Sequence, residues 1–592
     1  MADFSWEFPY PSRRMPVLAR NVVATSQPLA AQAGLRMLLA GGNAVDAAIA
    51  TAAALTVVEP VMNGIGSDAF ALVWDGKSLK GLNASGRAPR AWNPGRYAGQ
   101  VRMPTEGWDS VTVPGVVSAW AGLSAKLGKL AFETLLEPAI DYARNGFPVS
   151  PVVASQWESQ IPRLKDQPGF AQAFVRDGRA PRAGELFRFP EQADTLTEIA
   201  RTRGESFYRG TLAKRIADFS AACGGALDVD DLAAHQPDWV EPIGQGYRGY
   251  RMHEIPPNGQ GIAALIALGI LEHFDLGSIA VDGVDSLHLQ IEAMKLAFAD
   301  IYRYVADPRA MEIRGASLLD PAYLKARAKL IRRDRAGQAV AGLPPSGTVY
   351  LATADANGMM VSYIQSNYMG FGSGVVVPGT GISMQNRGYG FSLQPGHPNL
   401  VGGGKRPFHT IIPAFLTRDG QPVMSFGVMG ADMQPQGHLQ MVVRLIDYGQ
   451  NPQAAADAPR WKIALDGGLL LEHASGENVA RGLAQLGHRI TRTPPGSMEF
   501  GAAQLIHRLG DAYVAASEPR RDGQAVGFSC ANHGPQRPAL RACSRREVRL
   551  LRVVMASGSM RSSSNAGLSD ASARSKAGSN SAVLFTTSPC NP

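Results

Sequence analysis

The stretch Gly347–Ser366 constrains the fold most, because its residues can be assigned to one structure from their order alone. Thr348–Ala354 has the alternating pattern of a β-strand, and Asp355–Gly358 has the composition of a tight turn. Met359–Ser366 then returns as a second strand. The sequence therefore predicts a β-hairpin that begins at Thr348, directly after a glycine.

Two interpretations of Thr348 remain open on these local features. A threonine can simply open an edge strand. Alternatively, a cut before Thr348 would give this residue a free α-amino group beside its own hydroxyl. That pair forms a nucleophile with a built-in base. The remainder of the chain decides between them.

The composition indicates a large globular protein. Apolar residues make up 45% of the 592 residues and charged residues 18%, which favours a packed core over disorder. The 65 glycines and 40 prolines predict many tight turns. Composition is compatible with an α/β or an α+β fold and does not separate the two.

The positive charge is concentrated at the C-terminus. The net charge is +8, and residues 529–592 contain nine Lys/Arg and two Asp/Glu, so the body is close to neutral. We therefore expect no nucleic-acid partner. Residues 529–592 are rich in Arg, Ser, Gly and Ala, which predicts a disordered basic tail without function; a spurious extension is the alternative.

Cysteines and the N-terminal residues limit the chemistry and the location. Only Cys223 of the four cysteines precedes the tail, so the body has no disulfide framework or cysteine metal site. Met1–Arg20 lacks the apolar core of a signal peptide. Met37–Val58 is apolar but contains Gly, Asn and Asp, which indicates a buried helix rather than a membrane span. We expect a cytoplasmic protein without a membrane partner.

The N-terminal part alternates strands and helices. A strand is expected at 22–25, a helix from Pro28, and a second helix at 44–57 whose first turn is capped by Asn43. The second helix is apolar nearly all round, which is typical of burial. Asn63–Asp68 forms a glycine-rich loop, either a tight turn or a close backbone approach to a substrate pocket.

His288 and Glu292 lie one helical turn apart in the predicted helix Asp285–Phe298. A metal pair is conceivable at this spacing, but the sequence has no HExxH motif here and no third ligand nearby. We expect a side-chain contact on a solvated or inter-helix face, with no metal and no cofactor.

Several further motifs occur in order along the body. They are Ala33-Gly34, Gly41–Ala48, Val58-Glu59-Pro60, Gly64-Ile65-Gly66, Ser110–Gly115, Pro256–Gly261, His288–Asp307 and Thr348–Phe528. Together these motifs resemble the γ-glutamyltransferase family of N-terminal nucleophile hydrolases.

The resemblance implies a fold and a reaction. The fold is α+β, a four-layer αββα sandwich built jointly from a large region, 1–347, and a small catalytic region, 348–528, of one precursor. The Thr348 hydroxyl attacks the Gly347 carbonyl, and hydrolysis of the resulting ester separates the two subunits of a heterodimer. The free Thr348 then attacks a small-molecule amide, and the acyl-enzyme passes its acyl group to water or to an amine.

The resemblance also assigns roles within the small region. The backbone N–H groups of Gly430 and Ala431 would form the oxyanion hole, provided that alanine can replace a glycine there. Ser366 would hydrogen-bond the nucleophile. The residues expected to bind the substrate are Arg87, Asn367, Tyr368, Arg387, His409 and Thr410.

The substrate-binding positions depart from those of glutathione-hydrolysing members. Ser85 stands where such members have an arginine, and Gly390 stands where they have the acid that binds an α-amino group. The segments Gln365–Gly374 and Met433–His438 resemble the cephalosporin-acylase-like branch, whose members act on glutaryl-like amides. A terminal carboxylate could be held by Arg87 or Arg387. Both γ-glutamyl and glutaryl-like amides stay open, as does an uncleaved, inactive binding protein on the same fold.

Overall fold

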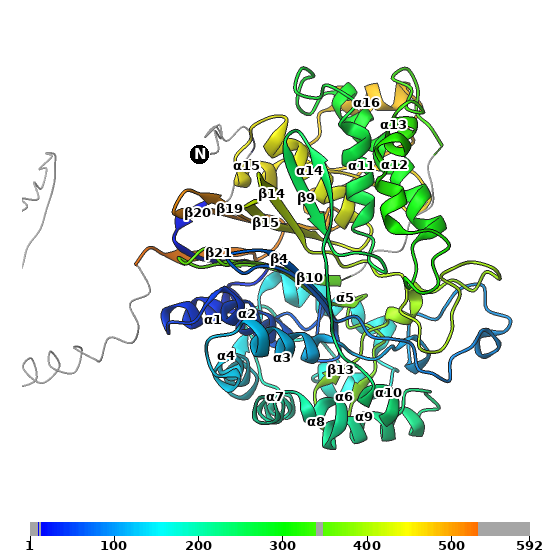
Figure 1. Cartoon of the computed structure of the whole chain (residues 1–592). Coiled ribbons are helices and arrows are strands. Elements are labelled where there is room, and N and C mark those ends of the chain that lie inside the picture. Colours follow the sequence, from blue (N-terminus) through cyan, green and yellow to red (C-terminus); the bar gives the residue numbers. More distant parts are fainter. Residues whose placement is uncertain (1–9, 11–13, 339–346, 531–592) are drawn as a thin grey trace, which may run out of the picture. The chain divides into compact units, whose positions relative to one another are not determined.

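Strand β10 lies in the interior of a seven-stranded sheet (Figure 1). The computed structural model describes residues 10, 14–338 and 347–530. In spatial order the strands of this first sheet are β21 (Gln524–Phe528), β2 (Asn21–Thr25), β10 (Gly347–Ala354), β11 (Met360–Tyr368), β3 (Asp68–Trp74), β4 (Leu79–Asn83) and β7 (Asp238–Val240).

A second seven-stranded sheet packs against the first through β15 and β19, which contact β10. Its strands in spatial order are β1 (Val17–Ala19), β20 (Ala512–Ser517), β19 (Ala502–Leu509), β15 (Gln421–Met429), β14 (Ala414–Arg418), β9 (Tyr250–Glu254) and β8 (Ile243–Tyr247). Smaller sheets are formed by β5 (Phe147–Pro148) with β6 (Leu186–Phe187), β12 (Val376–Val377) with β13 (Ile382–Ser383), and β16 (Trp461–Ile463) with β17 (Leu469–Leu471) and β18 (Ile490–Arg492).

Helices lie on the outer side of each large sheet, which gives the four-layer αββα arrangement (Figure 1). On the side of the first sheet are α1 (Pro28–Leu39), α2 (Ala44–Val58), α3 (Val116–Leu127), α4 (Phe132–Asn145), α5 (Pro151–Leu164), α6 (Phe170–Phe174), α7 (Pro190–Thr202), α8 (Glu205–Arg209), α9 (Thr211–Ala222) and α10 (Val229–Ala233). On the side of the second are α11 (Ile262–Leu271), α12 (Val284–Tyr304), α13 (Pro321–Ala328), α14 (Met433–Ile446), α15 (Pro452–Asp457) and α16 (Glu477–Gln485).

The strongest local predictions are confirmed. Asn43 caps α2, since its side chain accepts a hydrogen bond from the Asp46 N–H at 3.0 Å while Asp46 accepts one from the Asn43 N–H at 2.9 Å. Every residue of α2 is buried, as its uniformly apolar surface requires. The β10–β11 hairpin also forms, and Asp355 accepts hydrogen bonds within its turn.

Other expectations differ from the structure or fall outside it. The pattern of residues 115–345 predicts mostly helix, but this segment also contains β7, which joins the first sheet, and β8 and β9, which join the second. The predicted loop 341–346 and the tail from residue 531 lie outside the described residues. Within the described part of the chain, no helix is long and apolar enough to cross a membrane.

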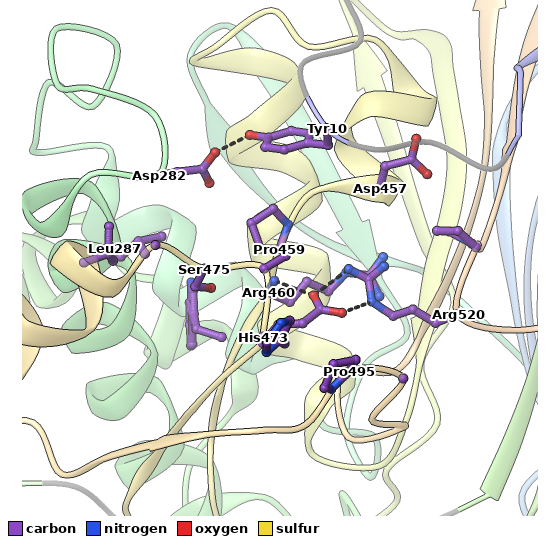
Figure 2. A pocket seen from close by; sticks show the side chains of 17 residues that line it. Tyr10, Asp282, Leu287, Asp457, Pro459, Arg460, His473, Ser475, Pro495 and Arg520 are labelled. Atoms are coloured by element: carbon purple, nitrogen blue, oxygen red, sulfur yellow. Dashed lines mark hydrogen bonds and ion pairs between the residues drawn. The ribbon is translucent and has the colours of Figure 1, made fainter.

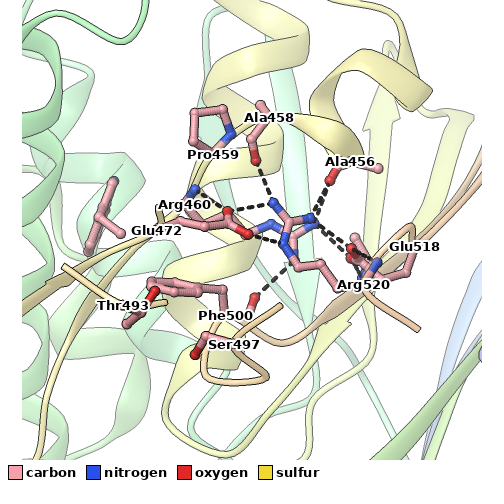
Figure 3. Close-up of polar contacts among 12 residues, drawn as sticks. Ala456, Ala458, Pro459, Arg460, Glu472, Thr493, Ser497, Phe500, Glu518 and Arg520 are labelled. Atoms are coloured by element: carbon pink, nitrogen blue, oxygen red, sulfur yellow. Dashed lines mark hydrogen bonds and ion pairs between the residues drawn. The ribbon is translucent and has the colours of Figure 1, made fainter. Parts of the chain in front are cut away.

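A buried ladder of two arginines and two glutamates fixes the end of the second sheet (Figure 3). Glu518 lies between Arg460 and Arg520, with oxygen–nitrogen distances of 2.8 and 2.7 Å. Arg520 also binds Glu472 at 2.6 Å. Arg460 donates to the Phe500 carbonyl at 2.9 Å, so the ladder holds the loop just before β19. The alternating charges compensate one another inside the protein.

Glu518→Gln should lower the free energy of unfolding at pH 7 by about 3 kcal/mol, because it leaves two buried guanidinium groups without their shared carboxylate. Burial opposes ionisation of Glu518, but Arg460 and Arg520 hold its pKa down at about 2. The contribution is therefore complete above the unfolded-state pKa and is lost as the pH falls toward 2. Urea titrations at several pH values measure this.

Glu205→Gln is the matched control, because Glu205 forms an exposed pair with Arg209 at 3.4 Å. This substitution should change stability by less than about 0.5 kcal/mol. An equal effect of the two substitutions would contradict the role given to the ladder.

Candidate active site

A chain of hydroxyl groups joins Thr348 to the carbonyl that precedes it. The pairing between β10 and β11 shifts register between Gly347 and Val349, so Thr348 lies in a bulge at the start of the strand. Its hydroxyl donates to Ser366 Oγ at 3.1 Å, and the Ser366 hydroxyl donates to the Gly347 carbonyl at 2.6 Å. The Tyr368 N–H donates to Ser366 Oγ at 2.8 Å and fixes this orientation.

The predicted oxyanion loop connects β15 to α14 and has unusual backbone angles. Gly430 has φ = 131° and Ala431 has φ = 55°. The second value lies in the left-handed region, which alanine adopts only at a cost of about 1 kcal/mol. Both N–H groups stand one or two residues ahead of Asp432 and the N-terminus of α14, where the helix dipole favours negative charge. Alanine thus takes up a glycine conformation without loss of the N–H.

Asp432 and Lys462 form a buried charge pair next to this loop. Lys462 Nζ lies 3.6 Å from Asp432 and 2.7 Å from Glu499. Burial raises the pKa of Asp432 to about 6, against the opposing effect of Lys462. Gly501 packs beneath the loop, since a Cβ on Gly430 would lie 3.1 Å from its Cα. The ladder at Arg460 therefore supports the oxyanion loop through Phe500 and Gly501.

The structure brings together three of the predicted substrate-binding residues, Arg387, Tyr368 and Thr410. Arg387 donates to Thr410 Oγ1 at 2.8 Å and stacks on the Tyr368 ring with its Cζ 4.8 Å from the ring centre. Its Nε and Nη2, like the Tyr368 hydroxyl, are buried without a hydrogen-bond partner among the described residues. Burial lowers the pKa of Arg387 to about 10, with Asp68 opposing that shift. Unpaired buried donors of this kind favour an anionic ligand.

His409 supports this group from behind. Its Nε2 lies 3.0 Å from Asp68 Oδ2, and both side chains are fully buried. Burial holds the pKa of His409 well below its usual value, so the ring is neutral. Because its Nδ1 accepts from the Ile411 N–H at 3.4 Å, the ring proton is on Nε2 and is donated to Asp68. Asp68 was missed as a functional residue. The only signal for it was its place in the glycine-rich loop Asn63–Asp68.

Two other predicted binding residues are engaged in the scaffold. Arg87 pairs with Asp307 at 3.0 Å and leaves about a third of its side chain exposed. The Asn367 amide accepts from Ser67 at 2.8 Å and donates to Ser383 at 3.2 Å. Of the two arginines that could hold a terminal carboxylate, Arg87 is thus already paired, whereas Arg387 keeps nitrogens without a hydrogen-bond partner among the described residues.

A cavity of about 460 Å³ opens beside the bond between Gly347 and Thr348. Gly347 and Gly430 both line it, together with Lys462 and Arg521. A different cavity, of about 510 Å³, adjoins Arg460 and Arg520 (Figure 2). Its described lining residues include none of the residues assigned to the reaction, whereas Gly347 and Gly430 make the first cavity the candidate active-site cavity.

Of the two faces expected for His288 and Glu292, solvated or inter-helix, the structure excludes the solvated one. His288 and Glu292 are buried, and His488 brings a third group whose potential ligand atom lies within 4.8 Å of theirs. Lys295 Nζ occupies the cation position, 2.8 Å from Glu292 and 3.4 Å from His488 Nδ1. His488 lies 2.8 Å from His288, which in turn contacts the Arg332 carbonyl at 2.7 Å. These groups satisfy one another, so the cluster does not fit a metal.

Comparisons with known proteins identify the family of the chain. The sequence model of the family described as Gamma-glutamyltranspeptidase matches residues 30–528. The chain belongs to this family. It is therefore an enzyme of the N-terminal nucleophile hydrolase fold, and the predicted αββα architecture is confirmed.

Named relatives cover most of the chain. The glutathione hydrolase-like YwrD proenzyme of Bacillus subtilis is 38% identical over 86% of this chain and 98% of its own. The oxamate amidohydrolase proenzyme of Klebsiella pneumoniae is 36% identical over 86% and 99%. The crystal structure of cephalosporin acylase from Bacillus halodurans is 50% identical, with a TM-score of 0.84, over 89% of this chain and 99% of that one.

Ala431→Gly should raise the free energy of unfolding by about 0.5–1 kcal/mol, because glycine adopts positive φ without strain. The N–H is retained, so kcat for an amide substrate should change by less than about twofold. Ala431→Val should reduce kcat by about tenfold or more, since a β-branched residue is poorly accommodated there. Urea titration and initial rates measure both. Equal kcat values for the two variants would contradict the requirement for positive φ.

Proposed function

We propose that this chain is a self-cleaving amidohydrolase in which Thr348 is the nucleophile. One observation carries the proposal: the Ser366 hydroxyl connects the Thr348 hydroxyl to the Gly347 carbonyl. The names of the relatives, which are proenzymes of hydrolases and acylases, support the same conclusion.

In the self-cleavage step the hydroxyl chain acts as a proton relay. Thr348 Oγ forms a bond to the Gly347 carbonyl carbon while its proton passes to Ser366, and the Ser366 proton passes to the carbonyl oxygen. The C–N bond then breaks as the proton on the former carbonyl oxygen passes to the nitrogen, which becomes the Thr348 α-amine, and an ester remains. Water hydrolyses the ester and releases the Gly347 carboxylate. The products are the regions 1–347 and 348–528, the latter with any tail that follows.

In the turnover step the free α-amine takes the proton of the Thr348 hydroxyl as this oxygen attacks an amide carbonyl. The N–H groups of Gly430 and Ala431 receive the developing oxyanion, in keeping with their position before the N-terminus of α14. The α-ammonium returns its proton to the leaving nitrogen. Water or an amine then takes the acyl group from Thr348.

The acyl group is proposed to bear a terminal carboxylate, as in glutaryl-like amides, held by Arg387 beside Tyr368 and Thr410. The buried, unpaired nitrogens of Arg387 support this assignment. A free γ-glutamyl group would need a partner for its ammonium. At Gly390, where the sequence comparison expects that acid, a Cβ would lie 2.3 Å from the Phe408 carbonyl oxygen, so an acidic side chain does not fit.

Thr348→Ala should abolish both cleavage and turnover, because it removes the only atom proposed to attack either carbonyl. Denaturing gels and intact mass should show one uncleaved chain. Thr348→Ser, which keeps a hydroxyl, is the control and should still give two chains. Cleavage or turnover by the alanine variant would reject Thr348 as the nucleophile. An uncleaved wild-type chain would favour the alternative of an inactive binding protein.

Arg387→Met should raise KM for glutaryl anilide by about tenfold or more, because a charge-assisted hydrogen bond contributes roughly 1.5–3 kcal/mol. KM for valeryl anilide, which has no carboxylate, should change far less. Arg87→Met is the matched control, since Arg87 is already paired with Asp307. If Arg87→Met has the larger effect on glutaryl anilide, the carboxylate site is at Arg87 instead.

A further inference from the structure

The cavity beside Gly347 has a cationic wall that the proposed reaction does not yet use. Three cations line it, Arg163, Lys462 and Arg521, against one carboxylate, Glu499. Two of these cations already have ion-pair partners. Arg163 binds Glu106 at 3.0 Å and the Gly370 carbonyl at 2.7 Å, and Lys462 is paired with Glu499. A carboxylate that entered the cavity would therefore meet Arg521 as the available cation.

Arg521 is held in the wall with two of its guanidinium nitrogens lacking a hydrogen-bond partner among the described residues. Its side chain is 7% exposed, and its Nε and Nη1 have no hydrogen-bond partner in the described part of the chain. Burial lowers the pKa of Arg521, and the carboxylates of Glu59, Glu518 and Asp522 oppose this shift, although none of them forms an ion pair with Arg521 within 4.0 Å among the described residues. Glu59 instead accepts a hydrogen bond from Ser26 at 2.6 Å. A buried guanidinium in this state favours an added anion.

The chemistry at Thr348 decides which part of a substrate reaches this wall. After self-cleavage the α-amine of Thr348 occupies the place of the peptide nitrogen that joined it to Gly347. This amine must deliver its proton to the leaving nitrogen, so the leaving group lies on the side where Gly347 was. The cavity lined by Gly347 is on that side. The acyl carboxylate, in contrast, is assigned to Arg387, which does not line this cavity among the described residues.

We propose that Arg521 is a specificity residue for amides whose amine portion carries a carboxylate, and that it binds this carboxylate in the cavity beside Gly347. The inference rests on the proposed function and adds the leaving side of the substrate to it. In the step itself the acyl C–N bond breaks, the Thr348 α-ammonium gives its proton to the leaving nitrogen, and the bound carboxylate is unchanged. A carboxylate-bearing amine that accepts the acyl group would bind at the same place, since its attack on the acyl-enzyme is the reverse of the release of the leaving amine.

The test compares two substrates that share the glutaryl group and differ by one carboxylate: glutaryl anilide and N-glutaryl-4-aminobenzoate. The wild-type enzyme should show a kcat/KM about tenfold higher for the aminobenzoate amide, as expected for one charge-assisted contact. In Arg521→Gln this ratio should fall toward one. Because the same enzyme is used for both substrates, the ratio is not affected by changes that slow both reactions equally. A two-chain gel pattern shows that the variant has undergone cleavage.

Arg163→Gln is the matched control, because Arg163 lines the same cavity with its guanidinium already bound. It should keep the wild-type ratio. An unchanged ratio in Arg521→Gln, or an equal loss in Arg163→Gln, would overturn the proposal. A wild-type enzyme that hydrolyses neither amide would instead count against the proposed function.

Product inhibition gives an independent measurement that needs no variant. With glutaryl anilide as substrate, 4-aminobenzoate should inhibit the wild-type enzyme at about a tenth of the concentration that aniline requires. Equal inhibition by the two amines would also overturn the proposal, even if Arg521→Gln failed to mature.

Discussion

The position of β10 between β2 and β11 is the constraint on which the site depends. Hydrogen bonds on both sides hold the strand, and the bulge at its first residues turns Thr348 out of the ladder toward Ser366. Because a rigid sheet carries the bulge, the two hydroxyl groups and the Gly347 carbonyl keep hydrogen-bonding distance while the protein is still one chain. The proposed nucleophile is thus positioned by backbone pairing.

Two buried guanidinium groups near Thr348 are proposed to determine which substrates bind. The guanidinium of Arg387 stands among aromatic and hydroxyl groups, and the guanidinium of Arg521 lines a separate cavity. Both are expensive to bury and neither has a full set of partners. The proposed substrate would supply the missing acceptors at its two ends. At position 390 the Phe408 carbonyl oxygen occupies the space that a side chain would need, in keeping with the proposed preference for a simple carboxylate.

The sequence predicted the elements that are defined by residues close together along the chain. The hairpin after Gly347 and the Asn43 cap follow from residues a few positions apart, so they could be predicted and are confirmed. Strands β7 and β9 could not, because each is short and pairs with a strand far along the chain, β4 and β14 respectively, and β8 joins the sheet only through β9. The contact between His288 and His488 could not be predicted for the same reason, because the two residues lie 200 positions apart. Asp68 likewise received no role from the sequence. Such contacts exist only after the sheets assemble.

The interleaving of strands in the first sheet has a consequence for the life of the protein after maturation. Strands β2, β3, β4 and β7 come from the chain before Gly347, whereas β10, β11 and β21 come from the chain after it. In the precursor these strands find one another as parts of one molecule. Once the bond is cut, an unfolded enzyme would have to reassemble the same sheet from two separate chains, so its recovery would depend on protein concentration. The precursor thus folds as a single chain, whereas refolding of the cleaved enzyme would require two chains to associate. That association is not needed while the sheet stays intact.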